Sequence, residues 1–104
     1  MVKSLKIAAS CYTVSEVAKA GADFGTCDHI MRHIRINKRM SKRDRQMTLL
    51  HEAIHAICQE YGISQYFAGE AEELVVRSLE VGVANLFREN KAFARELIET
   101  LSAN

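Results

Sequence analysis

Apolar residues recur with two different spacings along this chain, and the spacing changes near residue 40. In the first forty residues they alternate with polar or small residues, which is typical of strands with one buried face. The stretches concerned are Leu5, Ile7 and Ala9, then Tyr12 to Val14, then Ile30 to Asn37, with a loop containing Gly21, Gly25 and Asp28 before the last one. Beyond residue 40 the apolar residues recur at every third or fourth position, which is typical of amphipathic helices. The pattern therefore predicts a small N-terminal β-sheet followed by helices, an α+β fold.

Three helices are expected after the sheet. The first spans about Ser41 to Tyr61, because Ser41 can cap its N-terminus and Gly62 follows its last apolar position as a helix terminator. Its expected buried stripe consists of Met47, Leu50, Ile54, Ile57 and Tyr61. The other two are expected from about Gly69 to Asn90 and from Lys91 to Ser102.

Length and composition indicate one ordinary globular domain, residues 1–104. The chain has 104 residues, of which 48% are hydrophobic and 26% charged, and this suffices for one modest core. The formal net charge of +1 gives no global reason to expect binding to nucleic acid or to a membrane. No apolar run approaches the ~18 residues of a membrane span, and the first residues are too weakly apolar for a secretory signal. We therefore expect a soluble, cytoplasmic protein.

The most specific motif is His51-Glu52-Ala53-Ile54-His55, an H-E-x-x-H sequence inside the first predicted helix. Four residues of helix turn by about 400° and rise roughly 6 Å, so the two histidines lie one above the other and can direct two imidazole nitrogens at one ion. Glu52 is rotated away by about 100° and can meet a water molecule beside the metal, as a general base must. The motif predicts a catalytic zinc site; the alternative is a pair of ordinary, partly buried histidines.

A catalytic zinc ion takes a third protein ligand, and the second predicted helix offers acidic residues for it. Glu72 and Glu73 are each in phase with a different set of apolar positions on that helix, so periodicity does not choose between them. Acidic residues in a first helical turn are also favourable simply because they oppose the positive end of the helix dipole. Both glutamates are therefore candidate ligands.

In their order along the chain, these motifs resemble the small zincin-like metallopeptidases of phages and prophages, which are related in motif to the ImmA/IrrE and SprT-like groups. The stretches that carry the resemblance are Lys6-Ile7, Tyr12-Thr13-Val14, Gly25-Thr26-Cys27-Asp28, Ile34-Arg35-Ile36, Thr48-Leu49-Leu50-His51-Glu52, His55-Ala56, Glu72-Glu73 with Val76, and then Leu79 and Gly82. In such proteins the third ligand is a glutamate three residues before the helix valine, which implies Glu73 here. The chain departs from the pattern at Arg77, where relatives look acidic, and at Glu80, where they look small.

Motif and resemblance together lead us to expect a zinc-dependent peptidase that acts on a protein or peptide substrate. His51, His55 and Glu73 would hold Zn²⁺, and Glu52 would take a proton from the water that attacks a peptide carbonyl. The alternative, from a different functional class, is a metal-binding interaction protein of phage origin that keeps the zincin scaffold without efficient proteolysis.

Two further features of the catalytic site are expected. A developing oxyanion needs a hydrogen-bond donor, and the candidates are Tyr12, Tyr61, Tyr66, His29 and His33. In zincin-like folds a strand beside the metal helix binds the substrate backbone by β-addition. The strand around Ile34 to Asn37 is the candidate, because it directly precedes that helix.

The remaining ligand-type residues carry weaker hypotheses. Three cysteines, Cys11, Cys27 and Cys58, are expected to be free thiols in a cytoplasmic chain. Cys58 follows His55 by one turn and is considered as an extra ligand, although helix cysteines are usually small apolar fillers. A second cluster consists of Cys27, Asp28, His29 and His33. On a strand His29 and His33 would lie about 13 Å apart, which is too far for one ion.

The run from Arg35 to Arg45 is the one local excess of positive charge. Such a run is usually a solvated turn and helix start. The alternative is a surface that contacts nucleic-acid phosphates. No aromatic residue interleaves with these charges, which weakens any hypothesis of base stacking.

Overall fold

The computed structural model describes residues 1–18 and 24–103. Within these residues the chain forms a four-stranded sheet and then three α-helices, so the predicted α+β class is confirmed. The elements are β1 (Ser4–Ile7), β2 (Ser10–Val17), β3 (Gly25–Asp28), β4 (His33–Asn37), α1 (Lys42–Glu60), the short 3-10 helix η1 (Ser64–Tyr66), α2 (Gly69–Glu89) and α3 (Lys91–Ser102).

The sheet has the strand order β1-β2-β4-β3. β2 and β4 are parallel and lie in the middle, whereas β1 and β3 are antiparallel to their neighbours and form the two edges. Residues paired across the strands, such as Val14 and Ile34, have their side chains on the same face. One face of the sheet therefore collects the apolar residues of the alternating pattern.

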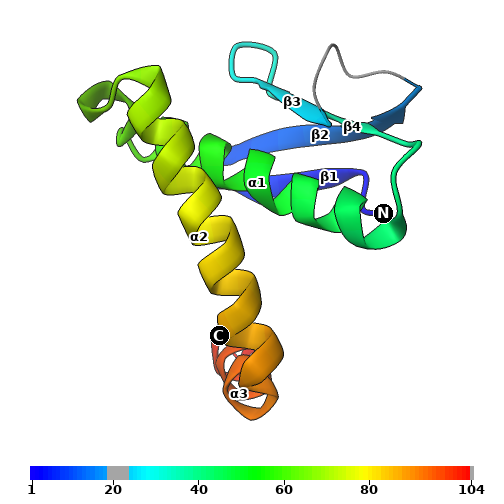
Figure 1. The fold of residues 1–104 in the computed structure, drawn as a ribbon. Coiled ribbons are helices and arrows are strands. Elements are labelled where there is room, and N and C mark those ends of the chain that lie inside the picture. Colours follow the sequence, from blue (N-terminus) through cyan, green and yellow to red (C-terminus); the bar gives the residue numbers. More distant parts are fainter. Residues whose placement is uncertain (19–23, 104) are drawn as a thin grey trace.

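α1 lies across that apolar face (Figure 1). The core between them contains the fully buried Tyr12, Ile34 and Ile36 of the sheet, together with Leu49 and Ala56 of α1. Burying a side chain such as isoleucine stabilises a fold by about 1.5–3 kcal/mol, so this layer holds α1 firmly on the sheet. α1 is thus a rigid support for any group that it carries on its remaining faces.

A second, smaller cluster joins α1 to α2. Ile54 and Cys58 of α1 pack against the fully buried Val76 of α2, with Leu50 at the margin. Because both helices are apolar at this crossing, the residues of α2 that precede and follow Val76 are fixed beside α1. The acidic residues predicted as candidate ligands lie in this part of α2.

Beyond the crossing, α2 extends away from the sheet, and α3 packs against its far end (Figure 1). None of the helices in the described part of the chain has the length and apolar character of a membrane span.

The predicted strand boundaries need three corrections. Ala9 is not in a strand, because the chain turns between β1 and β2 with Ala8 at a φ of 56°. The alternation from Ile30 onward overstates the last strand, which begins only at His33. Between β3 and β4 the Asp28 carboxylate accepts hydrogen bonds from the N–H groups of Ile30 and Met31 and stabilises a turn.

The third correction concerns the expected loop before that strand. Gly25 and Asp28 belong to β3, whose four residues lack a clear alternation of apolar and polar positions. The strand forms because it pairs with β4, and pairing of this kind leaves little trace in a short sequence. Gly21, the other residue of the expected loop, lies outside the described residues.

The ends of α1 were predicted correctly, but its buried stripe only in part. The Ser41 hydroxyl accepts a hydrogen bond from the Asp44 N–H, and Gly62 has a φ of 77° just after the helix. Of the expected stripe, Ile54 is buried, Met47 and Leu50 are half-buried, and Ile57 and Tyr61 are exposed. The other buried positions are Leu49, Glu52, Ala56 and Cys58. The stripe is misplaced because α1 is covered on two sides, by the sheet and by α2, and so buries more than one apolar face.

Candidate metal centre

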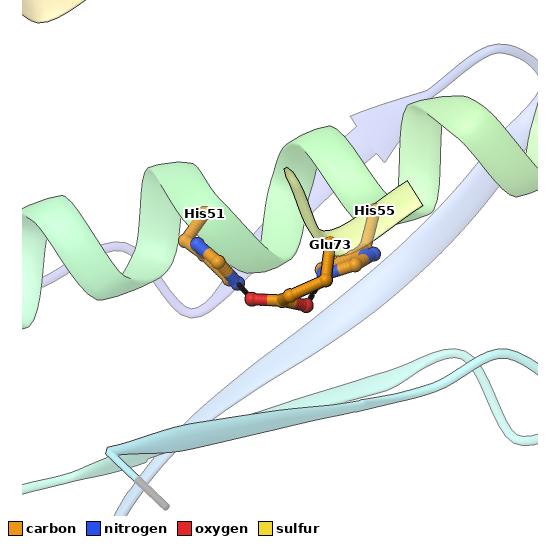
Figure 2. Close-up of side chains that lie close together, drawn as sticks. All are labelled: His51, His55 and Glu73. Carbon is orange, nitrogen blue, oxygen red and sulfur yellow. Dashed lines mark hydrogen bonds and ion pairs between the residues drawn. The ribbon is translucent and has the colours of Figure 1, made fainter. Parts of the chain in front are cut away.

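Two imidazole rings project from the same side of α1 (Figure 2). His51 and His55 are one turn apart, and their ring centroids are separated by 5.0 Å with an interplanar angle of 65°. Both side chains are mostly buried, with 18% and 14% of their surface exposed. They lie between the side of α1 that packs on the sheet and the side that packs on α2, where a cleft reaches them.

Glu73 of α2 reaches between the two rings (Figure 2). Its Oε1 lies 2.9 Å from Nε2 of His51, and its Oε2 lies 2.8 Å from Nε2 of His55. One ligand atom from each of the three residues can be chosen so that all lie within 4.8 Å of one another. Among the described residues, this is the one group of histidine, cysteine and carboxylate side chains close enough to share a metal ion.

Two more glutamates of α2 contact the other nitrogen of each ring. Nδ1 of His51 lies 2.8 Å from Oε1 of Glu80, and Nδ1 of His55 lies 2.7 Å from Oε2 of Glu72. The Ser64 hydroxyl, in η1, donates a hydrogen bond to the second oxygen of Glu72. The two rings are therefore held by carboxylates on both sides, with Glu73 against the Nε2 atoms.

The charges in this cluster shift the protonation equilibria of its members. Burial by itself lowers the pKa of His55, but the hydrogen bonds to Glu72 and Glu73 outweigh burial and the net shift is upward. Burial raises the pKa of Glu73, but the hydrogen bond from His55 and the charge of the nearby His51 outweigh burial. The net shift is downward and favours the carboxylate. The pKa of Glu72 is lowered in the same way, because Ser64 and His55 oppose its burial. At neutral pH the cluster therefore presents anionic oxygens to the two rings.

Glu52 lies next to this cluster on α1. It is buried, with 8% of its surface exposed, and it lines an open cleft of about 850 Å³ together with the histidines and Glu73. The other residues of the cleft wall are Phe24, Gly25, Thr26, Cys27, Thr48, Arg77, Glu80 and Val81. The cleft thus lies between β3 on one side and the helices α1 and α2 on the other.

The expectation that the strand around Ile34 to Asn37 binds a substrate backbone is wrong. This strand, β4, is paired on both sides, with β2 and with β3, so it has no open edge. The edge beside the cleft belongs to β3. β4 directly precedes α1 in the sequence, which is why it was expected at the cleft. The edge strand is β3, which precedes β4 in the chain and pairs with it on the side away from β2.

In the part of the chain that the structure describes, no strand pairs with this edge of β3. The Asn37 N–H donates a hydrogen bond to the Phe24 carbonyl, and in an antiparallel ladder residues facing the neighbouring strand alternate with residues facing away. Thr26 accordingly faces β4, whereas the N–H and C=O groups of Gly25 and Cys27 face the open edge.

The weaker candidate ligands do not belong to the group formed by His51, His55 and Glu73, although Cys27 lines the same cleft. Cys58 packs between Ile54 and Val76, as expected of an apolar filler. In the second cluster, Nε2 of His33 lies 2.8 Å from the Ser15 hydroxyl, whereas His29 has its Nδ1 3.6 Å from the Cys27 thiol. Burial and the nearby Glu52 raise the pKa of Cys27 to about 12, so this cleft residue is a neutral thiol.

None of the five expected oxyanion donors is among the residues that line the cleft. The Tyr12 hydroxyl, for example, donates a hydrogen bond to Glu60 at 2.7 Å. Within the basic run, Arg45 forms an ion pair with Glu16 at 3.2 Å, and the other cations are exposed. A contact of this run with nucleic acid stays a prediction.

Two side chains of this centre, Arg77 and Glu80, were not predicted from the sequence to lie here. Arg77 lines the cleft, and its guanidinium lies 3.5 Å from Oε1 of Glu73. Glu80 was noted only as a departure from the family pattern. The spacing of seven residues between Glu73 and Glu80, which places them on one helix face, was the available signal.

The donor set suits a divalent metal. Two imidazole nitrogens and one carboxylate oxygen are the ligands of many catalytic zinc sites, which hold ligands at about 2.0–2.2 Å and hence roughly 3.3–3.6 Å from one another. The Nε2 atoms lie 2.8 and 2.9 Å from the Glu73 oxygens, so a shift of less than about 1 Å would suffice to admit an ion. The residues present therefore fit a bound metal.

Comparison with known proteins gives one match. A family model described as the IrrE N-terminal-like domain, and classed among the peptidases, matches residues 12–98. Searches among the curated proteins and among the solved structures gave no match. The matched span includes most of β2, all of β3 and β4, the two histidines, Glu52, Glu73 and the first two thirds of α3. The chain belongs to the family of IrrE N-terminal-like domains, whose members are classed as peptidases.

Proposed function

We propose that this protein is a zinc-dependent metallopeptidase. The observation that carries the proposal is the position of the buried Glu52, which lies in the same cleft as the set His51, His55 and Glu73. A purely structural zinc site would need the ligands but not a buried carboxylate beside them on an open cleft. Membership in a peptidase family supports the same reaction.

In this proposal His51, His55 and Glu73 hold the metal. Zinc bound there would polarise a substrate carbonyl and lower the pKa of water from 15.7 toward about 7. Glu52 accepts the proton of the attacking water and then passes it to the leaving amine. Arg77, which also lines the cleft, supplies positive charge near the oxyanion that develops on the carbonyl.

The substrate is a polypeptide in extended conformation. Its backbone would pair with the open edge of β3, where the N–H and C=O groups of Gly25 and Cys27 face away from β4. β3 forms one wall of the cleft, so a strand added there lies over Glu52 and the histidines. Backbone pairing makes the site tolerant of different side chains, because it uses groups that every residue except proline has.

The decisive experiment changes Glu52 alone. Glu52→Gln keeps the size of the side chain, but an amide cannot accept the proton, so we expect hydrolysis of a peptide library to fall by at least about 100-fold. Zinc content, measured by atomic absorption, and the circular dichroism spectrum should stay those of the wild type. Binding to any partner should also be nearly unchanged, because no large contact surface is removed.

Wild-type protein with full zinc that cleaves no peptide and no denatured protein would contradict the proposal. An interaction protein with a zincin scaffold would then be the remaining interpretation, and Glu52→Gln would be indistinguishable from the wild type in the organism.

A further inference from the structure

We propose that Glu80 and Glu72 are positioning residues of the metal centre: each accepts the Nδ1 proton of one histidine and so keeps that ring's Nε2 directed at the metal. The inference rests on the metal site of the proposed function and adds two residues to it. It starts from a regularity of the cluster. In both rings Nδ1 faces an α2 carboxylate, at 2.8 Å in His51 and 2.7 Å in His55, and in both rings Nε2 faces Glu73.

A carboxylate at Nδ1 determines which ring nitrogen can bind a metal. A neutral imidazole has one N–H donor and one acceptor nitrogen, and an ionised carboxylate can only accept. With a metal ion between Glu73 and the two rings, Glu73 no longer accepts from Nε2, and the carboxylate at Nδ1 then selects the form with its proton on Nδ1 and its lone pair on Nε2. The same hydrogen bond fixes the rotation of the ring, and outer partners of this kind commonly orient metal-bound histidines.

The pairing follows from the way in which α2 crosses α1. Glu72, near the start of α2, contacts His55, and Glu80, two turns later, contacts the earlier His51. The two helices thus run in opposite directions along the cluster, and Val76 lies between the two glutamates at the centre of the helix contact. The packing of Val76 against Ile54 and Cys58 holds both carboxylates in place.

The simpler explanation for acidic residues on α2 is their effect on the helix dipole, and it does not account for Glu80. That effect is confined to about the first turn, whereas Glu80 is eleven residues beyond Gly69. Its side chain is only 16% exposed, and that of Glu72 only 14%. Glu72 is in the first turn, but it is also held by the Ser64 hydroxyl. A buried carboxylate is costly unless it is paired, so both contacts indicate a specific role.

The test uses the full chain and four variants: Glu80→Ala, Glu80→Gln, Glu72→Ala and, as the matched control, Glu70→Ala, which removes an exposed glutamate of the same helix. Zinc affinity is measured by competition with a chelator. We expect losses of about 10–100-fold for Glu80→Ala and Glu72→Ala, and no change for Glu70→Ala. Glu80→Gln should recover part of the affinity, because an amide oxygen still accepts the Nδ1 proton.

A second readout separates positioning from a general loss of structure. In ¹H–¹⁵N spectra of the zinc-loaded protein, the hydrogen-bonded Nδ1 proton of each histidine should give its own signal. Glu80→Ala should abolish the signal of His51 and leave that of His55, and Glu72→Ala should do the reverse. If Glu80→Ala fails to fold, Glu72→Ala still tests the role at His55, and Glu80→Gln should keep a shifted His51 signal together with a weaker zinc affinity.

The two proposals fail separately. Zinc affinity and a His51 signal that are unchanged in Glu80→Ala would overturn the positioning role while leaving the peptidase proposal intact. A wild-type protein that binds zinc, loses affinity in these variants and yet cleaves nothing would contradict the peptidase proposal alone.

Discussion

A Cβ atom placed on Gly25 would lie 2.7 Å from Cγ2 of Thr48, so β3 approaches α1 with no room for a methyl group. The same atom would lie 3.0 Å from the Arg35 carbonyl oxygen, which belongs to the neighbouring strand. Thr48 precedes His51 by three residues on α1. This contact therefore sets the separation between the open edge of the sheet and the metal centre, and hence the width of the cleft.

We expect Gly25→Ala to destabilise the protein. Overpacking of this kind costs about 1–3 kcal/mol, which would appear as a lower urea midpoint of unfolding. Adding Thr48→Ser, which removes Cγ2, should restore part of the loss, since the contact with the Arg35 carbonyl persists. Gly82→Ala is the matched control, because a Cβ placed there has nothing within 4 Å and an exposed helical glycine gains about 0.5–1 kcal/mol on this change. Equal effects of Gly25→Ala and Gly82→Ala would show that β3 can move away from α1 at no cost.

The metal content of the purified protein is the second prediction. We expect close to one zinc ion per chain, lost in His51→Ala and in His55→Ala because each removes one ligand. Glu73→Ala should weaken binding far more than Glu72→Ala, since only Glu73 faces the Nε2 atoms of both rings. Zinc content by mass spectrometry and chelator competition provide the measurements. Stoichiometric zinc in the double variant of His51 and His55, or a stronger effect of Glu72→Ala, would contradict this ligand set.

The third prediction concerns the edge strand. Cys27→Pro removes a backbone N–H that faces the open edge, and proline is tolerated at such positions of edge strands. Compared with Cys27→Ala, which keeps the N–H, it should lower kcat/KM by about 2–10-fold, the value of one hydrogen bond, with zinc content unchanged. Thr26→Pro is the contrasting variant, because its N–H faces β4 and its loss should destabilise the sheet. Identical kcat/KM values for Cys27→Pro and Cys27→Ala would exclude backbone pairing at this position.

The parts of this site that sequence could predict are local. The proximity of His51 and His55 follows from helical geometry once the helix is recognised, and the ends of α1 follow from Ser41 and Gly62. Each of these inferences involves residues within one turn of each other, so no knowledge of packing is needed.

The parts that sequence could not predict depend on how elements meet. Whether Glu72 or Glu73 faces the Nε2 atoms is decided by the angle and register of α2 against α1, which Val76 fixes through tertiary packing. The contact of Glu80 with His51 has the same origin. β3 was missed because a four-residue strand with a glycine has little intrinsic preference for extended structure, and its pairing partner supplies the rest.

The last prediction concerns acid sensitivity, and it is centred on Glu60 at the end of α1. Its carboxylate accepts hydrogen bonds of 2.7 Å from the hydroxyls of Ser10 and Tyr12 and lies 3.5 Å from the Arg32 guanidinium. The hydrogen bond from Ser10, then that from Tyr12, and the charge of Arg32 lower the pKa of Glu60 below its usual 4.5. A carboxyl with a lower pKa in the folded protein stabilises the fold above its unfolded pKa, and this contribution is lost as the pH falls through the folded pKa.

Urea unfolding of the wild type should therefore show falling stability as the pH is lowered from about 5 to about 3. Glu60→Gln cannot titrate, so its curve should be flatter in this range and its stability at neutral pH lower. The lowered pKa values of Glu72 and Glu73 add to the acid sensitivity of both proteins and cancel in the comparison.

At alkaline pH the stability depends on pH in the opposite direction because of Tyr12. Burial and the neighbouring Glu60 raise the pKa of Tyr12 from 10.0 to about 12. Its contribution is complete below pH 10.0 and is lost as the pH rises toward about 12, and Tyr12→Phe should remove this alkaline loss. Parallel acid curves for the wild type and Glu60→Gln would show that the link between β2 and the end of α1 does not depend on the charge of Glu60.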